Sequence, residues 1–425
     1  MDCSVPSMLS PENWPFSLEL LPQPAYMVGG AVRDAILGKT REYLDLDFVL
    51  PSDAVKVARK IATHYKAGFV LLDPQRQIAR VVFPHATADF AQAEGNSLET
   101  DLHRRDFTVN AIAYNPHTQE IIDPLQGYND LQQRLLRMIS PANLEDDPLR
   151  LMRAYRQAAQ LGFTIEPETQ AVIRSLASHI TKVAPERVRV ELGYMLANAQ
   201  GSSWIASAWE DGLITPFFKY ATKESVSLLA MVDSSASQLA EIWQQFGVEL
   251  AQYVRDTVKT TWLAIAKLAT LVNPEPETAQ IELVELTYSR AEIKAVTTVL
   301  RLLPQLKTPL MSLREQYFLF QEAGFVFPAI ATLAVAHTIS VEAISNDNAL
   351  DMYAPLITRY LNPDDLVAHP TALLSGEDLM LALNIPASPL VGQLLTEIAV
   401  AQIEGKISTQ EQAIEFAAGL LKIRD

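Results

Sequence analysis

Residues 26–50, YMVGGAVRDAILGKTREYLDLDFVL, decide the fold of the N-terminal part of this chain. The apolar start predicts a strand, Gly29 and Gly30 permit a turn of unusual φ, and residues 32–37 predict a short helix. A strand that turns through glycine into a helix N-terminus presents free N–H groups to an anion. Because Arg33 lies in the first helical turn, its guanidinium can join these groups in binding a phosphate.

The same stretch ends in a second predicted strand, residues 43–50, with an acidic pair on one face. Because side chains alternate along a strand, Asp45 and Asp47 share one face and the apolar residues share the other. Two adjacent carboxylates repel each other, and a divalent cation relieves that repulsion. Mg²⁺ is the usual ion where a nucleoside triphosphate supplies the remaining oxygens. The pattern therefore predicts a magnesium and nucleotide site. Taken alone, the two glycines also fit a plain turn, and the acidic pair also fits a solvated strand face.

The composition is that of a globular protein with more than one domain: 425 residues, of which 49% are hydrophobic and 20% charged. No apolar run approaches the roughly 18 residues that a membrane span needs, and the N-terminal sequence lacks the features of a signal peptide. The single cysteine, Cys3, excludes an intramolecular disulfide and a cysteine-based zinc site. We expect a cytoplasmic protein without a membrane segment.

The net charge of −16 limits how this chain can bind nucleic acid. Contacts to phosphate supply most non-specific affinity for RNA and DNA, and an acidic surface opposes them. The charge argues against a protein that coats RNA without regard to sequence. It leaves room for a local basic track.

Residues 25–115 predict a mixed α/β domain around the acidic strand. We expect one further helix and three further strands, at 53–65, 69–72, 79–83 and 86–91. Asp89 falls on the last of these strands, where it would face Asp45 and Asp47 as a third carboxylate that helps to hold or deprotonate an attacking hydroxyl. An aspartate at a strand end is the alternative interpretation.

The segment His103-Arg-Arg-Asp-Phe-Thr-Val-Asn-Ala-Ile-Ala113 brings several polar groups together beside apolar anchoring positions. Two guanidiniums suit a triphosphate, and a carboxylate suits a ribose hydroxyl. The amide of Asn110 adds a donor and an acceptor. Taken alone, the Arg-Arg-Asp run also fits a solvated charged surface.

A helix is predicted to begin after Asp147 and to carry a basic stripe. Asp147 is a good N-cap, Pro148 suits the first helical position, and Gly162 closes the helix. Three arginines follow on one side of it at a spacing of three, Arg150, Arg153 and Arg156. Such a run in an acidic chain indicates an anionic ligand, whereas Asp147 alone is explained by capping.

Together these motifs resemble the class II tRNA nucleotidyltransferases and bacterial poly(A) polymerases of the polymerase β nucleotidyltransferase superfamily. The motifs are GGAVRD at 29–34, DLD at 45–47, RRDFTVNA at 104–111 and Asp146–Arg150, which is similar to the family's EDxxR. The resemblance implies an α+β fold: a polymerase β-like head with a mixed sheet and helices, then an all-α neck, body and tail. The implied domains are a head at 1–139, a neck at 140–200, a body at 201–360 and a tail at 361–425.

The resemblance also implies how the head binds its ligands. Asp45 and Asp47 would hold two Mg²⁺ ions for nucleotidyl transfer to an RNA 3′-hydroxyl. Arg105 and Asp106 would hold the phosphates and ribose of the nucleotide, with Asn110 nearby. The glycine turn and the arginines of the later helix would complete the nucleotide site: Gly29, Gly30, Arg33, Arg150, Arg153 and Arg156.

In this family the Asp and Arg of EDxxR act as a protein template for the incoming base. Asp147 would accept from the exocyclic amine of cytosine or adenine, while Arg150 would donate to the ring. Uracil presents a carbonyl instead, and an unpaired buried polar group costs about 1–3 kcal/mol, which implies selection against UTP. Asp146 stands where the family has Glu.

Two later segments resemble the family less closely. PERVRVEL at 185–192 is similar to a segment that braces the templating helix, which assigns that role to Glu186 and Arg189. Residues 389–395 are similar to a tail segment in which a helix N-terminus meets the tRNA acceptor stem, which assigns an RNA contact to Gly392. The sequence between them predicts helices, with loops at 233–237, 273–278 and 362–365.

The distance between Asp89 and RRDFTVNA bears on the subtype. Only residues 90–103 intervene, whereas family members that add complete CCA or the terminal A are expected to carry a longer, flexible, charged loop. The short segment favours an enzyme that adds two cytidines to the 3′ end of tRNA from CTP. A CCA-adding enzyme, an A-adding enzyme using ATP, and a poly(A) polymerase are the alternatives, and the sequence leaves the oligomeric state open.

Two other classes of protein fit less well. A non-catalytic RNA-binding protein would not need Asp45 and Asp47, and both are intact. A small-molecule nucleotidyltransferase would share these carboxylates but would have no use for the templating helix or for a tail that binds the acceptor stem.

Overall fold

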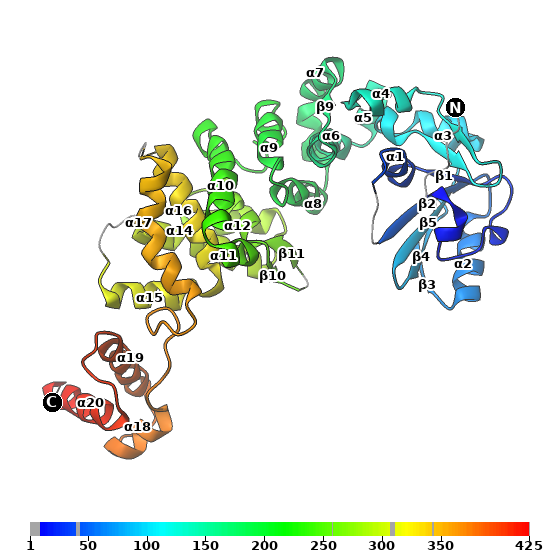
Figure 1. Ribbon diagram of the computed structural model, residues 1–425. Coiled ribbons are helices and arrows are strands. Elements are labelled where there is room, and N and C mark those ends of the chain that lie inside the picture. Colours follow the sequence, from blue (N-terminus) through cyan, green and yellow to red (C-terminus); the bar gives the residue numbers. More distant parts are fainter. Residues whose placement is uncertain (1–8, 40–42, 257, 307–310, 342–343, 425) are drawn as a thin grey trace. The chain divides into compact units, whose positions relative to one another are not determined.

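The computed structural model of the chain describes residues 9–39, 43–256, 258–306, 311–341 and 344–424, so Cys3 lies outside the described residues. Contacts within the chain divide it into two compact units, described separately below (Figure 1). The first comprises Met1–Val188 and Glu210–Leu213, and the second comprises Arg189–Trp209 and Ile214–Asp425. The four-domain division expected from the sequence is finer than this and stays a prediction.

The first unit is built on a mixed seven-stranded sheet in the order β3-β4-β5-β2-β1-β6-β7 (Figure 1). Its strands are β1 (Tyr26–Val28), β2 (Leu44–Leu50), β3 (Gly68–Asp73), β4 (Ile78–Phe83), β5 (Ala86–Gln92), β6 (Ala113–Asn115) and β7 (Glu120–Ile122). Strands β2 and β5 pair in parallel, and the other neighbours in this sheet are antiparallel. The mixed sheet expected for the head is therefore present.

Strand β2 separates the polar and apolar sides of this sheet, as its alternation predicts. Phe48 is buried, and its ring centroid lies 5.1 Å from that of Trp14 and 5.7 Å from that of Phe16. These two aromatic residues belong to the segment before β1, so that segment completes the apolar core. Asp45 and Asp47 point to the opposite side.

Helices surround the sheet and continue the first unit. They are α1 (Gly30–Ile36), α2 (Ala54–Tyr65), α3 (Leu98–His103), α4 (Gly127–Gln133), α5 (Pro141–Asp146), α6 (Leu149–Leu161), α7 (Pro167–Leu176) and α8 (Pro185–Leu196), the last of which continues into the second unit. A short parallel pair joins β8 (Leu135–Leu136) to β9 (Thr164–Ile165).

The second unit is largely helical, with one short hairpin formed by β10 (Tyr253–Arg255) and β11 (Val258–Thr261). Its main helices are α9 (Gly201–Glu210), α10 (Lys223–Ile242), α11 (Gln244–Leu250), α12 (Trp262–Leu271), α13 (Pro276–Glu285), α14 (Arg290–Leu306), α15 (Leu313–Ala323), α16 (Phe327–Val341) and α17 (Asn346–Leu361). The helical remainder expected after the head is confirmed, apart from these two short strand pairs.

The loop predicted at 233–237 is wrong, because these residues lie inside α10. Asp233 forms an ion pair with the fully buried Lys267, 2.5 Å away, and accepts a hydrogen bond from Ser202. Ser235 is also fully buried. Asp233, which favours turns in isolation, is therefore retained in the helix by partners on neighbouring helices.

The statement that no apolar run approaches the length of a membrane span is also wrong. By length and composition the helical run Leu313–Ser340 is long and apolar enough to cross a membrane, but 67% of its apolar window is buried within the structure. Helix α16, which forms much of this run, packs against α10, α12 and α14. Its position in the core of the second unit accounts for its apolar composition.

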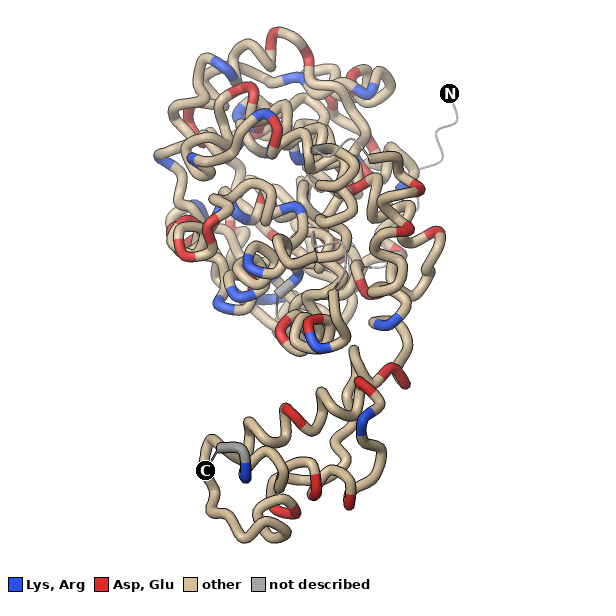
Figure 2. Tube along the Cα trace, turned by 90° about the vertical axis from the view of Figure 1, so that its left-hand side faces the viewer, with Lys and Arg blue, Asp and Glu red and all other residues tan. Residues whose placement is uncertain are grey.

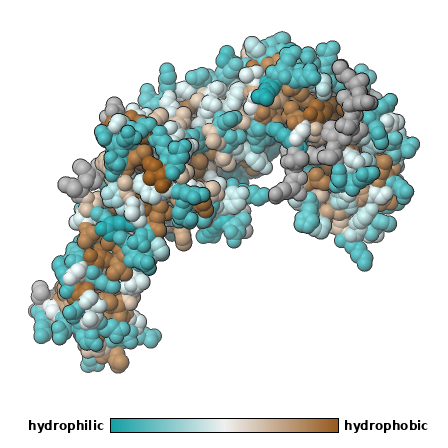
Figure 3. All heavy atoms as spheres, in the orientation of Figure 1, coloured by the Kyte–Doolittle hydropathy of each residue, from teal (hydrophilic) through white to brown (hydrophobic). Residues whose placement is uncertain are grey.

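The C-terminal part of the second unit is a small helical cluster of α18 (Gly376–Leu383), α19 (Pro389–Ile403) and α20 (Gln410–Arg424). Leu379, Leu394 and Ile398 form the centre of its core. Apolar patches remain visible between hydrophilic residues on its surface (Figure 3), and Leu381 is 86% exposed. A core this small leaves part of the apolar surface uncovered.

Candidate active site

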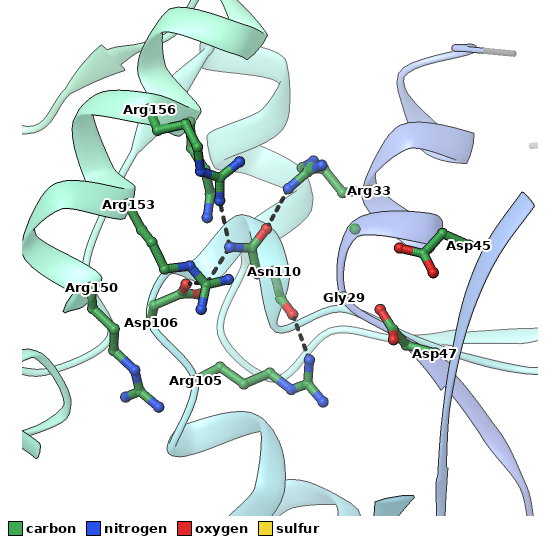
Figure 4. A pocket seen from close by; sticks show the side chains of 12 residues that line it. Gly29, Arg33, Asp45, Asp47, Arg105, Asp106, Asn110, Arg150, Arg153 and Arg156 are labelled. Carbon is green, nitrogen blue, oxygen red and sulfur yellow. Dashed lines mark hydrogen bonds and ion pairs between the residues drawn. The ribbon is translucent and has the colours of Figure 1, made fainter. Parts of the chain in front are cut away.

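A cavity of about 430 Å³ lies in the first unit where α1, β2, the segment after α3 and α6 meet (Figure 4). Asp45 and Asp47 lie on one side of it and the arginines of α6 on the other. Its lining residues are Gly29, Gly30, Arg33, Asp45, Asp47, Arg105, Asp106, Asn110, Arg150, Arg153, Arg156 and Gln157. All of these except Gln157 were predicted from the sequence. Three predicted site residues lie outside this lining: Asp89, Asp147 and Gly392.

Gly29 lets the turn before α1 approach the acidic strand closely. Its φ is +73°, a value that residues other than glycine rarely adopt. A Cβ atom here would lie 3.3 Å from Nη1 of Arg105 and 3.5 Å from Oδ2 of Asp47. The glycine turn thus borders both the predicted phosphate site and the predicted metal site.

The carboxylates of Asp45 and Asp47 are held close together and repel each other, and a divalent cation would relieve that repulsion. Thr87 on β5 donates a 2.6 Å hydrogen bond to Oδ1 of Asp45. The pKa of Asp47 is raised to about 7, mainly by burial and then by the nearby charges of Asp45 and Asp89, against the opposing effect of Arg105 and Arg80. Carboxylate oxygens are the hard ligands that Mg²⁺ prefers, so two carboxylates held together against their repulsion suit this ion.

Asp89 lies beside the acidic pair, as expected, but it has a basic partner. The register of β2 and β5 places Asp89 opposite Asp47. Arg80 on β4 donates to both carboxylate oxygens of Asp89, at 2.7 and 2.8 Å. Sequence reasoning missed Arg80, because only the pairing of β4 with β5 brings these two residues together.

Asn110 is the centre of a hydrogen-bond network at the back of the cavity (Figure 4). Its Oδ1 accepts from Nη1 of Arg33 at 2.7 Å. Its Nδ2 donates to Asp106 at 2.8 Å and to Oε1 of Gln157 at 2.9 Å. Gln157 was missed, although it follows Arg153 by four residues and therefore shares its face of α6.

Asp106 is nearly fully buried and stays ionised. Burial alone would raise its pKa, but the charge of Arg153 and hydrogen bonds from Asn110 and the N–H of Phe107 outweigh burial and lower it. Nη2 of Arg153 lies 3.2 Å from Oδ2 of Asp106. Apart from this ion pair, that oxygen has no hydrogen bond from the described residues, so it has a lone pair that can accept from a ribose hydroxyl.

Arg150 lines the cavity as expected and is held by backbone carbonyls. Its Nη1 donates to the carbonyl of Arg104 at 2.9 Å and to that of Asn143 at 2.8 Å. These contacts bring the segment after α3 and the end of α5 to the guanidinium. The predicted base-reading arginine is therefore fixed at the edge of the site.

Asp147 caps α6 as predicted. Pro148 already has helical φ and ψ, the N–H of Leu149 donates to Oδ1 of Asp147 at 3.4 Å, and the N–H of Arg150 donates to the carbonyl of Asp147 at 2.9 Å. The carboxylate also forms an ion pair with Arg187, 3.1 Å away. Asp147 is at the same time the C-cap of α5, a helix that the sequence pattern did not predict.

A contact from the segment 185–192 reaches the start of α6, where Nη2 of Arg187 donates to Oδ2 of Asp147 at 3.1 Å. Sequence reasoning did not assign this contact to Arg187. Arg189 donates to the carbonyl of Thr287 at 2.7 Å, within the second unit. The bracing role of Glu186 and Arg189 stays a prediction.

The short segment that bears on the subtype is folded. It holds the end of β5, a 3₁₀ turn at Glu94–Asn96 and α3, where Ser97 accepts from the N–H of Thr100 as the N-cap. Glu94 forms an ion pair with Arg104, 2.7 Å away. The segment between β5 and the Arg-Arg-Asp motif is therefore formed mainly by a short turn and a helix, and not by a long loop.

Gly392 lies in the first turn of α19, far along the sequence from the cavity. A Cβ atom there would meet no described atom within 4 Å, so there is open space beside its Cα. Its contact with RNA stays a prediction.

Family models match three parts of the chain. A poly A polymerase head domain matches residues 25–137, and a probable RNA and SrmB-binding site of polymerase A matches residues 162–224. A putative domain 2 of tRNA nucleotidyltransferases matches residues 256–418. The first match contains most of the cavity lining.

The chain is 48% identical to the CC-adding tRNA nucleotidyltransferase of Synechocystis sp. over 410 residues, which is 96% of each protein. The chain belongs to the class II tRNA nucleotidyltransferases. A second class II relative, the CC-adding tRNA nucleotidyltransferase of Geobacter sulfurreducens, is 30% identical and covers 93% of this chain and 91% of its own length.

A solved class II structure shows the same fold. The Thermotoga maritima CCA-adding enzyme complexed with tRNA_CCA matches with a TM-score of 0.69 at 20% identity, over 94% of this chain and 91% of that one. The predicted architecture of a nucleotidyltransferase head and a helical remainder is confirmed by this likeness.

Proposed function

We propose that this class II tRNA nucleotidyltransferase adds two cytidines to the 3′ end of tRNA from CTP and releases pyrophosphate. The observation that carries the proposal is the single cavity where two strand carboxylates face a row of arginines (Figure 4). Its likeness over nearly the whole chain to a relative named for CC addition supports the subtype. We place the reaction in the cytoplasm, where tRNA is processed.

The acidic pair is the proposed site for two Mg²⁺ ions. Asp45, held by Thr87, and Asp47 offer oxygens of the kind that Mg²⁺ prefers. Bound Mg²⁺ lowers the pKa of the attacking 3′-hydroxyl and neutralises the leaving pyrophosphate. Asp89 lies next to this pair, and its part is taken up below.

The nucleotide is proposed to lie between the glycine turn and α6. Arg33 and Arg105, with the N–H groups at the start of α1, bind its phosphates. The hydrogen-bond acceptor of Asp106 binds its ribose. Arg153 and Arg156 add positive charge on the far side of the cavity.

The base is proposed to be read by Arg150 and Asp147. Arg150 already faces the cavity, whereas Asp147 forms an ion pair with Arg187. Both members of that pair are partly exposed, so the ion pair holds Asp147 only weakly. Turning of Asp147 from Arg187 towards the base would complete the template.

The test is an extension assay with the full chain and a tRNA that lacks CCA. The tRNA is offered CTP alone, ATP alone or both, and product lengths are read on a sequencing gel. Two added residues with CTP, unchanged by ATP, support the proposal. Three residues with both nucleotides would contradict it in favour of CCA addition, and a long A tail would favour a poly(A) polymerase. Asp45→Asn serves as the inactive control.

A further inference from the structure

Three neighbouring strands carry a row of charged side chains across one face of the sheet. Asp47 on β2 lies opposite Asp89 on β5, and Asp89 lies opposite Arg80 on β4. Residues directly opposite each other in a sheet point to the same face, so all three side chains share the face of the active site. The order across the strands is carboxylate, carboxylate, guanidinium.

The outer carboxylate is bound differently from the inner one. Arg80 donates from Nε and Nη2 to the two separate oxygens of Asp89, at 2.7 and 2.8 Å. This fork geometry is the strongest arrangement between the two groups, and it fixes the orientation of both. The side chain of Asp89 is 18% exposed, so solvent screens the pair only in part.

Asp89 is not placed as a third carboxylate ligand in the described part of the chain. Asp45 and Asp47 line the cavity, and Asp89 does not. Among the described residues no group of three or more His, Cys, Asp or Glu side chains is placed to hold a metal ion, although three aspartates lie on these two strands. The two hydrogen bonds from Arg80 to Asp89 offer a physical reason why Asp89 does not complete such a group.

We propose that Arg80 is a positioning residue that withholds Asp89 from the metal, so that Asp45 and Asp47 alone supply the protein's carboxylate ligands. A guanidinium bound to both oxygens takes one lone pair of each and fixes the orientation of the carboxylate, and its own charge repels a cation at that side. The inference rests on the proposed metal site. The alternative is an ordinary cross-strand ion pair that has no effect on the metal.

The experiment measures Mn²⁺ affinity of the full chain without nucleotide, by the loss of the electron paramagnetic resonance signal of free Mn²⁺. The variants are Arg80→Gln, Asp89→Asn and the double variant. Arg76→Gln is the control for loss of a positive charge, since Arg76 is 70% exposed on the turn between β3 and β4 and contacts neither Asp47 nor Asp89.

We expect Asp89→Asn and Arg76→Gln to bind Mn²⁺ within about twofold of the unaltered chain. Arg80→Gln frees a third carboxylate and should bind Mn²⁺ about tenfold tighter, because affinity for hard cations rises with the number of carboxylate ligands. The double variant should return to the affinity of Asp89→Asn alone. This last comparison separates ligation by Asp89 from a general effect of charge.

Three results would overturn the inference. If Asp89→Asn weakens Mn²⁺ binding about tenfold, Asp89 is already a ligand, and this test does not require Arg80→Gln to fold. If Arg80→Gln leaves the affinity unchanged, the ion pair does not control ligation. If the gain persists in the double variant, it comes from charge alone. Failure of Asp47→Asn to weaken Mn²⁺ binding would instead refute the proposed metal site itself.

Discussion

A side chain at Gly29 would crowd Arg105 and would need a φ that residues other than glycine rarely adopt. We expect Gly29→Ala to lower kcat/KM for CTP incorporation by about 10²-fold, because the added Cβ, 3.3 Å from Nη1 of Arg105, would shift that guanidinium and small displacements of reacting groups have effects of this size. Steady-state kinetics checks the change. Gly162→Ala is a suitable control, since it also has positive φ but open space around its Cβ. Equal losses in both variants would show that backbone strain alone is responsible.

Asp47 should titrate near neutral pH in the metal-free protein. Its pKa of about 7 lies above the unfolded value of 3.8, so the folded state binds the proton more tightly. The stability that this group contributes is complete below about pH 4 and is lost as the pH rises to 7. Because Mn²⁺ competes with that proton, Mn²⁺ affinity should fall by about tenfold per pH unit below pH 7.

The titration can be followed by carboxyl ¹³C NMR without metal and by Mn²⁺ binding between pH 5.5 and 8.5. Asp45→Asn removes one of the charges that raise the pKa of Asp47, so its midpoint should move to lower pH. A midpoint below pH 5 in the unaltered chain would contradict the effect of burial.

At this scale, residue types and spacing predicted nearly the whole lining of the cavity. The predicted residues of the lining belong to short motifs, such as the acidic pair on β2. The residue types in such a motif indicate its chemistry without knowledge of the rest of the fold. Thr87, Arg80 and Gln157 were missed because their partners lie on other strands or helices and depend on register. The partner of Asp147 was missed for the same reason.

Helix α6 is held from behind by a buried acid. Tyr155 donates to Asp211, which also accepts from Gln170 and Arg174. We expect Tyr155→Phe to lower the free energy of unfolding of the first unit by about 1–3 kcal/mol, because the acid loses a buried donor. Urea denaturation measures this. Tyr128→Phe, at an exposed position on α4, should change nothing, and equal midpoints for both variants would contradict the role given to Tyr155.

Arg150, on the side of α6 that lines the cavity, should govern nucleotide choice. We expect Arg150→Ala to reduce the preference for CTP over UTP by about tenfold or more, in line with about 1–3 kcal/mol for an unpaired polar group, while transfer itself slows less. Competition between the two nucleotides in the extension assay measures the ratio. Arg104→Ala removes an exposed neighbouring guanidinium and serves as the control. Unchanged selectivity in Arg150→Ala would remove the template interpretation.

Elements with strong periodicity were predicted well, and their boundaries less so. The alternation in β2 and the glycine turn before α1 are both present. The predicted loop at 233–237 failed because Lys267 and Ser202 stabilise a helix that the local sequence disfavours. The start of α6 after Asp147 was predicted correctly, because an N-cap aspartate followed by proline is a local signal.

Within the second unit, one ion pair links α15 to the C-terminal cluster. Arg314 donates to both oxygens of Glu397, at 2.9 and 2.6 Å. If the start of α19 contacts RNA, Arg314→Glu should weaken tRNA binding several-fold by releasing this helix. The charge swap, Arg314→Glu with Glu397→Arg, should restore most of the affinity. Filter binding measures both variants, and full affinity in Arg314→Glu would show that the link is dispensable.

For the molecule as a whole, the sequence predicted the fold class and the family, and the comparisons confirm both. It also predicted the CC-adding subtype, which stays a proposal that the likeness to relatives named for CC addition supports. They were predictable because the motifs of the head are specific and closely spaced. The arrangement of the second unit was not, since its helices carry no comparable motif and its polar residues pair across the core.

The distribution of charge described here has a consequence for turnover. The chain is acidic overall, and acidic residues dominate the C-terminal cluster (Figure 2), while arginines gather around one cavity. Ribosomal RNA and other abundant polyanions should therefore compete poorly for this enzyme. A finished tRNA should likewise have a short residence time, leaving the protein free for the next unfinished end.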